Sequence, residues 1–295
     1  MIRAERIAIG SILVGCLVLG LKLLAWRMTG SVALYSDALE SIVNVAASVV
    51  ALVAIRVARM PADANHPYGH EKAEFFAAVI EGGLILLAAV AILHEAWLAF
   101  WAPRALEQAW AGLAVSAVAT GLNAGWGLFL INRGRHLRSM ALAADGRHLM
   151  ADVVTSLGVT IGIGLATLTG YWVLDPVLAA VTAVHVLWSG VRMITQSVDG
   201  LMDAAPDADT VARVRALVAE HAVGALEAHD LRMRHAGRLT FLDFHLVVPG
   251  TMTVADSHAI CDRIEAALAA DMEFLKTTIH VEPEGKAQHQ GVLVL

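Results

Sequence analysis

Residues 36–48 read SDALESIVNVAAS, and residues 143–156 read AADGRHLMADVVTS. The two stretches align at a constant offset of 108 residues, which pairs Glu40 with His148 and Asn44 with Asp152. Both stretches lie inside long apolar runs, where an ionisable side chain is costly and points to a function. The alignment therefore predicts two related halves, each of which places polar side chains in an apolar interior.

The composition is that of a membrane protein. Hydrophobic residues make up 58% of the 295 residues and charged residues only 16%, whereas soluble domains carry about 25% charged residues. About 20 apolar residues suffice to cross a bilayer as a helix, and six stretches meet this requirement. The predicted spans are 7–27, 32–58, 73–101, 106–132, 139–168 and 172–195. The first run is longer than the apolar part of a typical signal peptide, so we interpret it as a retained span.

The distribution of basic residues predicts the orientation of these spans. Most Lys and Arg residues near the span ends fall on one side, and the opposite side offers only Arg27 and Arg104. The positive-inside rule then places both termini in the cytoplasm. Spans two and five would run in opposite directions, which makes the halves inverted three-helix repeats. In such transporters the substrate site lies at the repeat interface, near the middle of the membrane.

The last third of the chain has a different character. Residues 207–221 and 253–270 show helical patterns, and residues 226–234, 239–248 and 276–282 show strand patterns. We therefore expect a six-helix transport domain at 1–200 and a cytoplasmic ferredoxin-like α+β domain of order αββαβ at 201–295. The whole net charge of −6 lies after residue 200. Such an acidic segment attracts cations and argues against a nucleic-acid partner.

The strongest candidate site is the one formed by the two aligned stretches. Glu40 and Asn44 are four residues apart and share one helix face, as do His148 and Asp152. If the pairs face each other, they supply four N and O donors, which suits a tetrahedral Zn²⁺-like ion. Glu40 and Asp152 bring two negative charges, enough to neutralise one divalent cation. The alternative is a set of interhelical hydrogen bonds without metal.

Other polar residues in the spans have less certain roles. Asp37 and Asp145 lie one turn before the candidate ligands, where they either guide ions or bond only to backbone and water. Glu81 in span three has no partner that the sequence identifies. His185 in span six is interpreted as a packing or interfacial residue rather than as a ligand.

A second candidate is the loop PADANHPYGH, in which Asp63, His66 and His70 form a metal clip, with a solvated polar loop as the alternative. A third lies on the predicted sheet. Strand alternation turns Leu242, Phe244, Leu246 and Val248 to the core and leaves a histidine- and carboxylate-bearing face outside. The candidates of this third site are His245, His280 and Glu282, joined by His229 and His258. A surface histidine on a strand is often only solvated, which remains the alternative here.

Several motifs in order make the chain similar to a cation diffusion facilitator of the bacterial iron/zinc-efflux type. The motifs are SDALESIVNVAAS, NHPYGHEKAE, ADGRHLMADVVTSLG, YWVLDPVLA, EAHDLRMRHAG with FLDFHL, and IHVEP. The resemblance covers nearly the whole chain. It implies a multi-pass protein of the bacterial inner membrane and a homodimer joined through the cytoplasmic domains. It also implies an ion pair between Lys72 and Asp203 and the exchange of metal for protons.

The resemblance assigns the same three groups of metal ligands. The transport site maps to Glu40, Asn44, His148 and Asp152, the loop site to Asp63, His66 and His70, and the cytoplasmic site to His229, His245, His258, His280 and Glu282. Zinc-transporting relatives commonly carry His or Asp at the position of Glu40 and Asp at that of Asn44, so the amide of Asn44 departs from the zinc pattern and lowers the charge of the site. Zinc stays the first expectation for the substrate and regulatory metal, and this departure leaves iron, manganese, cobalt and cadmium open.

These observations predict an exporter of divalent metal that works by alternating access and proton antiport. His148 suits the exchange, because the unperturbed pKa of histidine is about 6.5. A membrane-anchored metal sensor or metallochaperone is the alternative, although an anchor gains nothing from ligands inside the membrane. We do not expect an enzyme, because no activated nucleophile or open three-ligand signature supports a membrane hydrolase.

Overall fold

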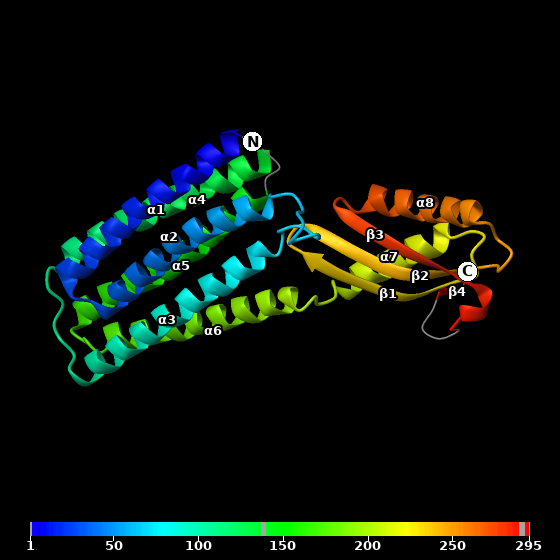
Figure 1. Cartoon of the computed structure of the whole chain (residues 1–295). Helices are drawn as coiled ribbons and strands as arrows, with labels where there is room; N and C mark the ends of the chain where they lie inside the picture. Colours follow the sequence, from blue (N-terminus) through cyan, green and yellow to red (C-terminus); the bar gives the residue numbers. More distant parts are fainter. Residues whose placement is uncertain (1, 137–139, 289–292, 295) are drawn as a thin grey trace. The chain divides into compact units, whose positions relative to one another are not determined.

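The computed structural model describes the backbone of residues 2–136, 140–288 and 293–294. Six long helices come first and follow the apolar runs (Figure 1). They are α1 (Ile2–Thr29), α2 (Val32–Ala58), α3 (Ala73–Trp101), α4 (Ala109–His136), α5 (Met140–Thr169) and α6 (Leu174–Leu201). Within the described residues, all six are long and apolar enough to cross a membrane. The predicted six-span architecture is confirmed.

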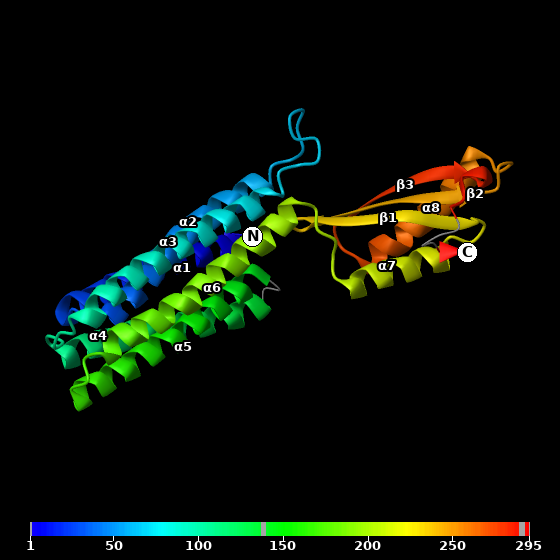
Figure 2. The same ribbon diagram turned by 90° about the horizontal axis from the view of Figure 1, so that it is seen from below.

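The C-terminal part has the predicted order αββαβ. It consists of α7 (Ala208–His221), β1 (Glu227–Ala236), β2 (Leu239–Val248), α8 (Val254–Asp271) and β3 (Leu275–Pro283), followed by a 3-10 turn and the short β4 (Leu293–Val294). The strand order is β3-β2-β1-β4, with β2 antiparallel to β1 and parallel to β3. Figure 2 shows α7 and α8 on one face of this sheet.

The chain forms two compact units. One comprises residues 1–53 and 77–195, and the other comprises residues 54–76 and 196–295. The loop between α2 and α3 thus belongs with the C-terminal unit. The predicted domain boundary after residue 200 remains a prediction.

The junction between α1 and α2 explains why two helices form where one apolar run would otherwise continue. Gly30 adopts a φ of +65° and donates its backbone N–H to the carbonyl of Trp26, which ends α1. Asp175, at the start of α6, accepts hydrogen bonds from the backbone N–H groups of Val32 and Ala33 at 2.8 and 3.0 Å. A carboxylate is favourable at a helix N-terminus, so Asp175 fixes the start of α2 against α6.

Small residues allow the membrane helices to approach closely. A Cβ at Gly146 of α5 would lie 2.7 Å from the carbonyl oxygen of Gly127 of α4, so only glycine fits there. Such contacts are typical of membrane interfaces, where close backbone packing replaces the hydrophobic driving force of water. The packing of α4 on α5 therefore fixes the part of α5 that carries the predicted ligands.

The core of the C-terminal unit confirms the predicted strand alternation. Leu242, Phe244 and Leu246 are at most 1% exposed and pack with residues of α7 and α8. Asp207 caps α7 by accepting the backbone N–H of Thr210, and that hydrogen bond lowers the pKa of its carboxyl group. Because the inward residues of β2 are buried under the helices, the alternate residues face the other side of the sheet.

Candidate metal sites

The membrane unit joins two residues that the 108-residue offset pairs. Asn44 of α2 donates a side-chain hydrogen bond to the carboxylate of Asp152 of α5, at 2.6 Å. Glu40 lies one turn before Asn44, and its Oε1 is buried without a hydrogen bond among the described residues. Glu40, Asn44 and Asp152 line one cavity of about 140 Å³. A buried carboxylate oxygen without a donor is costly, and a cation would satisfy it.

The fourth predicted ligand cannot be placed in the same way. The side chains of His148 and Asp145 lie outside the described residues, although the helix α5 that carries them is described. The assignment of His148 stays a prediction. His185 of α6, which the sequence analysis interpreted as packing or interfacial, lines the cavity beside Glu40 and Asp152, and its ring lies near that of Trp188.

A buried ion pair stands next to this cavity and was missed by the sequence analysis. The Nζ of Lys22 of α1 lies 2.8 Å from Oδ1 of Asp37 of α2, and both side chains are 2% exposed. Ser156 of α5 accepts from Lys22 at 3.1 Å and donates to Asp37 at 2.6 Å. Asp37 is thus held by the side chains of Lys22 and Ser156, whereas the sequence offered either ion guidance or bonding to backbone and water alone. A lysine within the first apolar run was the available signal.

The loop between α2 and α3 brings Asp63, His66 and His70 together. Nδ1 of His66 lies 3.2 Å from Asp63, and Nε2 of His70 lies 3.5 Å from the other carboxylate oxygen. One donor atom from each residue falls within 4.8 Å of the others. The backbone N–H groups of His66 and Asn65 donate to Asp63, and the bond from His66 is the main cause of a lowered pKa for its carboxyl group. The loop thus holds an ionised carboxylate between two imidazoles.

The sheet aligns three histidines across three strands. His229 of β1 pairs in register with His245 of β2, which pairs in register with His280 of β3. Glu282 lies on the same face, with carboxylate oxygens 3.4 Å from Nε2 of His229, 3.4 Å from Nδ1 of His245 and 3.7 Å from Nε2 of His280. Nε2 of His229 and Nδ1 of His245 are buried without a hydrogen bond among the described residues. Imidazole nitrogens around a carboxylate suit a transition metal.

Glu227 supports this group and was not recognised in the sequence. Its Oε1 lies 2.9 Å from Nδ1 of His229, and both side chains are nearly fully buried. A carboxylate on one ring nitrogen fixes the tautomer and turns the other nitrogen toward the metal position, as is usual for metal-binding histidines. The signal was available, because Glu227 and His229 are two residues apart and share one face of the strand.

His258 lies apart from the other predicted ligands of the sheet. It is exposed on α8, where its Nε2 lies 3.6 Å from the carboxylate of Asp262. The compact group within the described residues consists of His229, His245 and Glu282, with the ring of His280 centred 4.9 Å from that of His245. The assignment of His258 stays a prediction.

The ion pair between Lys72 and Asp203 is present at 2.8 Å, as the resemblance implied. Asp203 also contacts Arg234 of β1 at 3.3 Å. The hydrogen bond from Lys72 is the main cause of a lowered pKa for the Asp203 carboxyl group. The C-terminal unit thereby holds its α2–α3 loop through charged contacts.

Family models match both parts of the chain. The model of the cation efflux transmembrane domain matches residues 8–202, and that of the cation efflux protein cytoplasmic domain matches residues 206–284. The first match alone covers more than half of the chain.

Individual relatives match over nearly their whole length. An uncharacterized transporter of Synechocystis, sll1263, is 39% identical over 95% of this chain and 90% of its own. The cation-efflux pump FieF of Shewanella oneidensis is 31% identical over 89% of this chain and 88% of its own. A solved structure of CzrB in its Zn form is 47% identical over 28% of this chain and 96% of that chain, with a TM-score of 0.28.

Proposed function

The chain belongs to the cation efflux family and is a multi-pass membrane transporter of cations, and we propose that it exports divalent transition-metal ions in exchange for protons. The observation that carries this proposal is the group of Glu40, Asn44 and Asp152 around one cavity among the membrane helices. We assign His148 as the fourth ligand of the transported ion. Both chain termini would lie in the cytoplasm of a bacterial cell, with the protein in the inner membrane.

Charge supports a divalent substrate. Lys22 neutralises Asp37 through their buried ion pair, so two further carboxylates remain, those of Glu40 and Asp152. Two negative charges in an apolar surrounding favour one divalent cation over a monovalent one. The ion would displace Asn44 from the carboxylate of Asp152, since a carboxylate must offer its oxygen to bind metal.

Proton exchange follows from the same ligands. Metal binding requires a neutral imidazole and ionised carboxylates, so protons and metal compete for one site. In an outward-open state, an acidic exterior would protonate the ligands and favour release of the metal. The protonated site would then return to the cytoplasmic side, which completes alternating access.

The sheet group gives the C-terminal unit a second role. Metal held by His229, His245, His280 and Glu282 would neutralise an acidic domain and stabilise a homodimer formed through it. We propose that this binding, supported by His258 and by the loop residues Asp63, His66 and His70, favours one transporter conformation. Zinc is the first candidate metal, followed by iron, manganese, cobalt and cadmium.

Transport by purified protein in proteoliposomes tests the proposal. When a proton gradient is imposed across the membrane, the wild type should move Zn²⁺ in the direction opposite to the flow of protons. Asp152→Asn should abolish this movement. His148→Ala should remove the coupling to protons. A membrane-anchored sensor or metallochaperone would bind Zn²⁺ without moving it. Wild-type protein that binds Zn²⁺ but leaves the vesicle interior unchanged would therefore establish the alternative.

A further inference from the structure

Helix α3 carries a carboxylate that the transport site does not use. Glu81 lies eight residues after the start of α3 at Ala73, which is about 12 Å into the helix. The surrounding sequence AAVIEGGLILL is otherwise apolar. An ionisable residue at such a depth in a membrane helix is costly and therefore indicates contact with a polar pathway.

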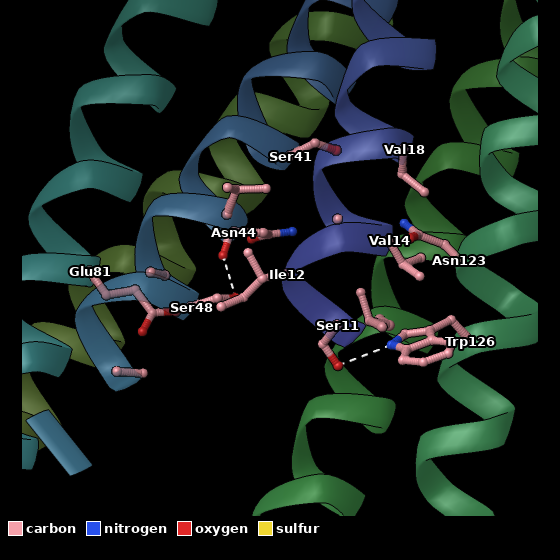
Figure 3. Close-up of a pocket in the computed structure, with 15 residues that line it drawn as sticks. Ser11, Ile12, Val14, Val18, Ser41, Asn44, Ser48, Glu81, Asn123 and Trp126 are labelled. Atoms are coloured by element: carbon pink, nitrogen blue, oxygen red, sulfur yellow. Dashed lines mark hydrogen bonds between the residues drawn. The ribbon is translucent and has the colours of Figure 1, made fainter. Parts of the chain in front are cut away.

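Glu81 lines a second cavity, larger than the first, of about 410 Å³ (Figure 3). Its polar lining includes the carboxylate of Glu81, the amides of Asn44 and Asn123, and the hydroxyls of Ser11, Ser41 and Ser48. Trp126 also lines it and donates its indole N–H to Ser11 at 3.0 Å. Glu81 is the only ionisable side chain among the described residues that line it. The part of the lining that the structure describes thus offers oxygen ligands and one carboxylate.

This cavity ends at the transport site. Asn44 lines both cavities, and its hydrogen bond to Asp152 lies at the point they share. The α2 residues of the larger cavity extend from Ser41 to Ala51, toward the end of α2 that leads into the loop to α3. Glu81 lies near the end of α3 that leaves the same loop. The larger cavity is therefore on the side of Asn44 that we propose faces the cytoplasm.

The size of the cavity allows a cation to keep its shell of water. A water molecule occupies about 30 Å³ in the liquid, so a shell of six waters needs about 180 Å³. The cavity of about 410 Å³ at Glu81 is therefore large enough for an ion with its complete shell. Amide and hydroxyl groups are suitable partners for the waters of such a shell, and a carboxylate supplies the attraction.

We propose that Glu81 forms a staging site for a hydrated divalent cation, from which the ion loses water and passes to Glu40 and Asp152. The inference rests on the proposed transport function but assigns a separate residue and cavity. Glu81 acts on the hydrated ion before coordination. Its removal should therefore lower the apparent affinity for substrate and leave the rate at saturation unchanged.

Hexaamminecobalt(III) provides a direct probe, because it has the size of a hydrated cation and does not exchange its ligands. Its binding to the purified full-length protein can be measured by calorimetry without any transport.

Glu81→Gln should weaken this binding about tenfold, a loss that corresponds to about 1.4 kcal/mol. Glu81→Asp should retain it, since the charge is kept. Glu95→Gln, at the other end of the same helix, is the matched control and should bind as the wild type does. Equal binding by wild type and Glu81→Gln would overturn the proposal.

Transport kinetics separate this inference from the proposed function. In proteoliposomes that transport Zn²⁺, Glu81→Gln should raise KM about tenfold and change kcat less than about twofold. A lowered kcat at constant KM would contradict the staging role and indicate a structural one. If the wild type does not transport Zn²⁺, the proposed function fails, and the calorimetry still decides whether Glu81 holds a hydrated cation.

Discussion

The candidate sites in the membrane and on the sheet differ in the atoms they offer. The membrane site offers oxygens of Glu40, Asn44 and Asp152, with a single imidazole from the proposed ligand His148. The sheet surrounds one carboxylate with three imidazoles. Nitrogen donors suit transition metals better than amide and carboxylate oxygens do. We infer that the membrane site is suited to release its ion and the sheet site to retain it.

The two sites also differ in what holds the donors in place. The sheet site depends on strand register, with Glu227 fixing the ring of His229 at 2.9 Å. In the membrane, Asn44 and Asp152 bond to each other across two helices and must separate for a cation to bind. A fixed site favours tight binding, whereas a site that must rearrange couples binding to a change of conformation.

The largest effect expected from this contrast is on transport. Glu40→Gln removes one of the two carboxylate charges that line the cavity, so it should slow Zn²⁺ transport about a hundredfold or more. Zinc binding by the sheet site should be unchanged. Proteoliposome flux and calorimetry on the same preparation measure both quantities. His245→Ala is the reciprocal control, which should lose sheet binding and keep measurable flux. Normal flux in Glu40→Gln would remove the functional distinction between the two sites.

The next effect concerns the support of the sheet site. Glu227→Gln keeps the shape of the side chain but weakens the acceptor that orients His229, and such changes cost about 10- to 100-fold in metal affinity. Asp152→Asn is a suitable background for the calorimetry, because it silences the membrane site. Glu220→Gln, in the solvent-facing part of α7, is the matched control and should bind zinc normally. If Glu227→Gln binds as tightly as the background, strand register alone would fix the sheet ligands.

A third change should make the membrane site bind its ion more tightly, as the sheet site does. Asn44→Asp replaces the donor to Asp152 by a third carboxylate beside Glu40 and Asp152, so the empty site becomes repulsive and a divalent ion more strongly held. We expect KM for Zn²⁺ to fall about tenfold and kcat to fall with it, because release becomes slower. Gln196→Glu, at an exposed position of α6 outside both cavities, controls for the added charge alone. An increase in kcat for Asn44→Asp would contradict the view that weak coordination serves release.

The sequence predicted the elements better than the contacts between them. Apolar runs gave the six helices, and strand alternation gave the buried face of β2 through Leu242, Phe244 and Leu246. The pairing of Lys22 with Asp37 could not be predicted, because it depends on how α1 and α2 pack against Ser156 of α5. Periodicity within one helix carries no information on which helix its polar face meets.

The same limit applies to the candidate sites. Helical spacing put Glu40 and Asn44 on one face, but the contact with Asp152 needed the second helix. His185 appeared to be a packing residue because only the fold brings α6 to the cavity. On the sheet, by contrast, alternation alone placed His245, His280 and Glu282 on one face. Strand geometry with a period of two is therefore more informative about a site than helix geometry is.

The smallest expected effect comes from the charged contact that lies outside both sites. Lys72 and Asp203 are 33% and 45% exposed, so solvent screens their pair and limits its value to at most about 1 kcal/mol. Asp203 has a φ of +60°, a region that asparagine tolerates, so Asp203→Asn removes the charge without adding backbone strain.

Because Lys72 lowers the pKa of Asp203, the pair stabilises the fold above the ordinary carboxyl pKa near 4, and this contribution is lost as pH falls through the lowered value. Thermal unfolding of wild type and Asp203→Asn should therefore differ by a few degrees at pH 7 and converge once the pH falls below the lowered pKa of Asp203. Added salt should shrink the difference at pH 7, and zinc affinity at the sheet should not change. A difference that persists after the Asp203 carboxyl group is fully protonated would show that Asp203 stabilises the loop through its shape rather than its charge.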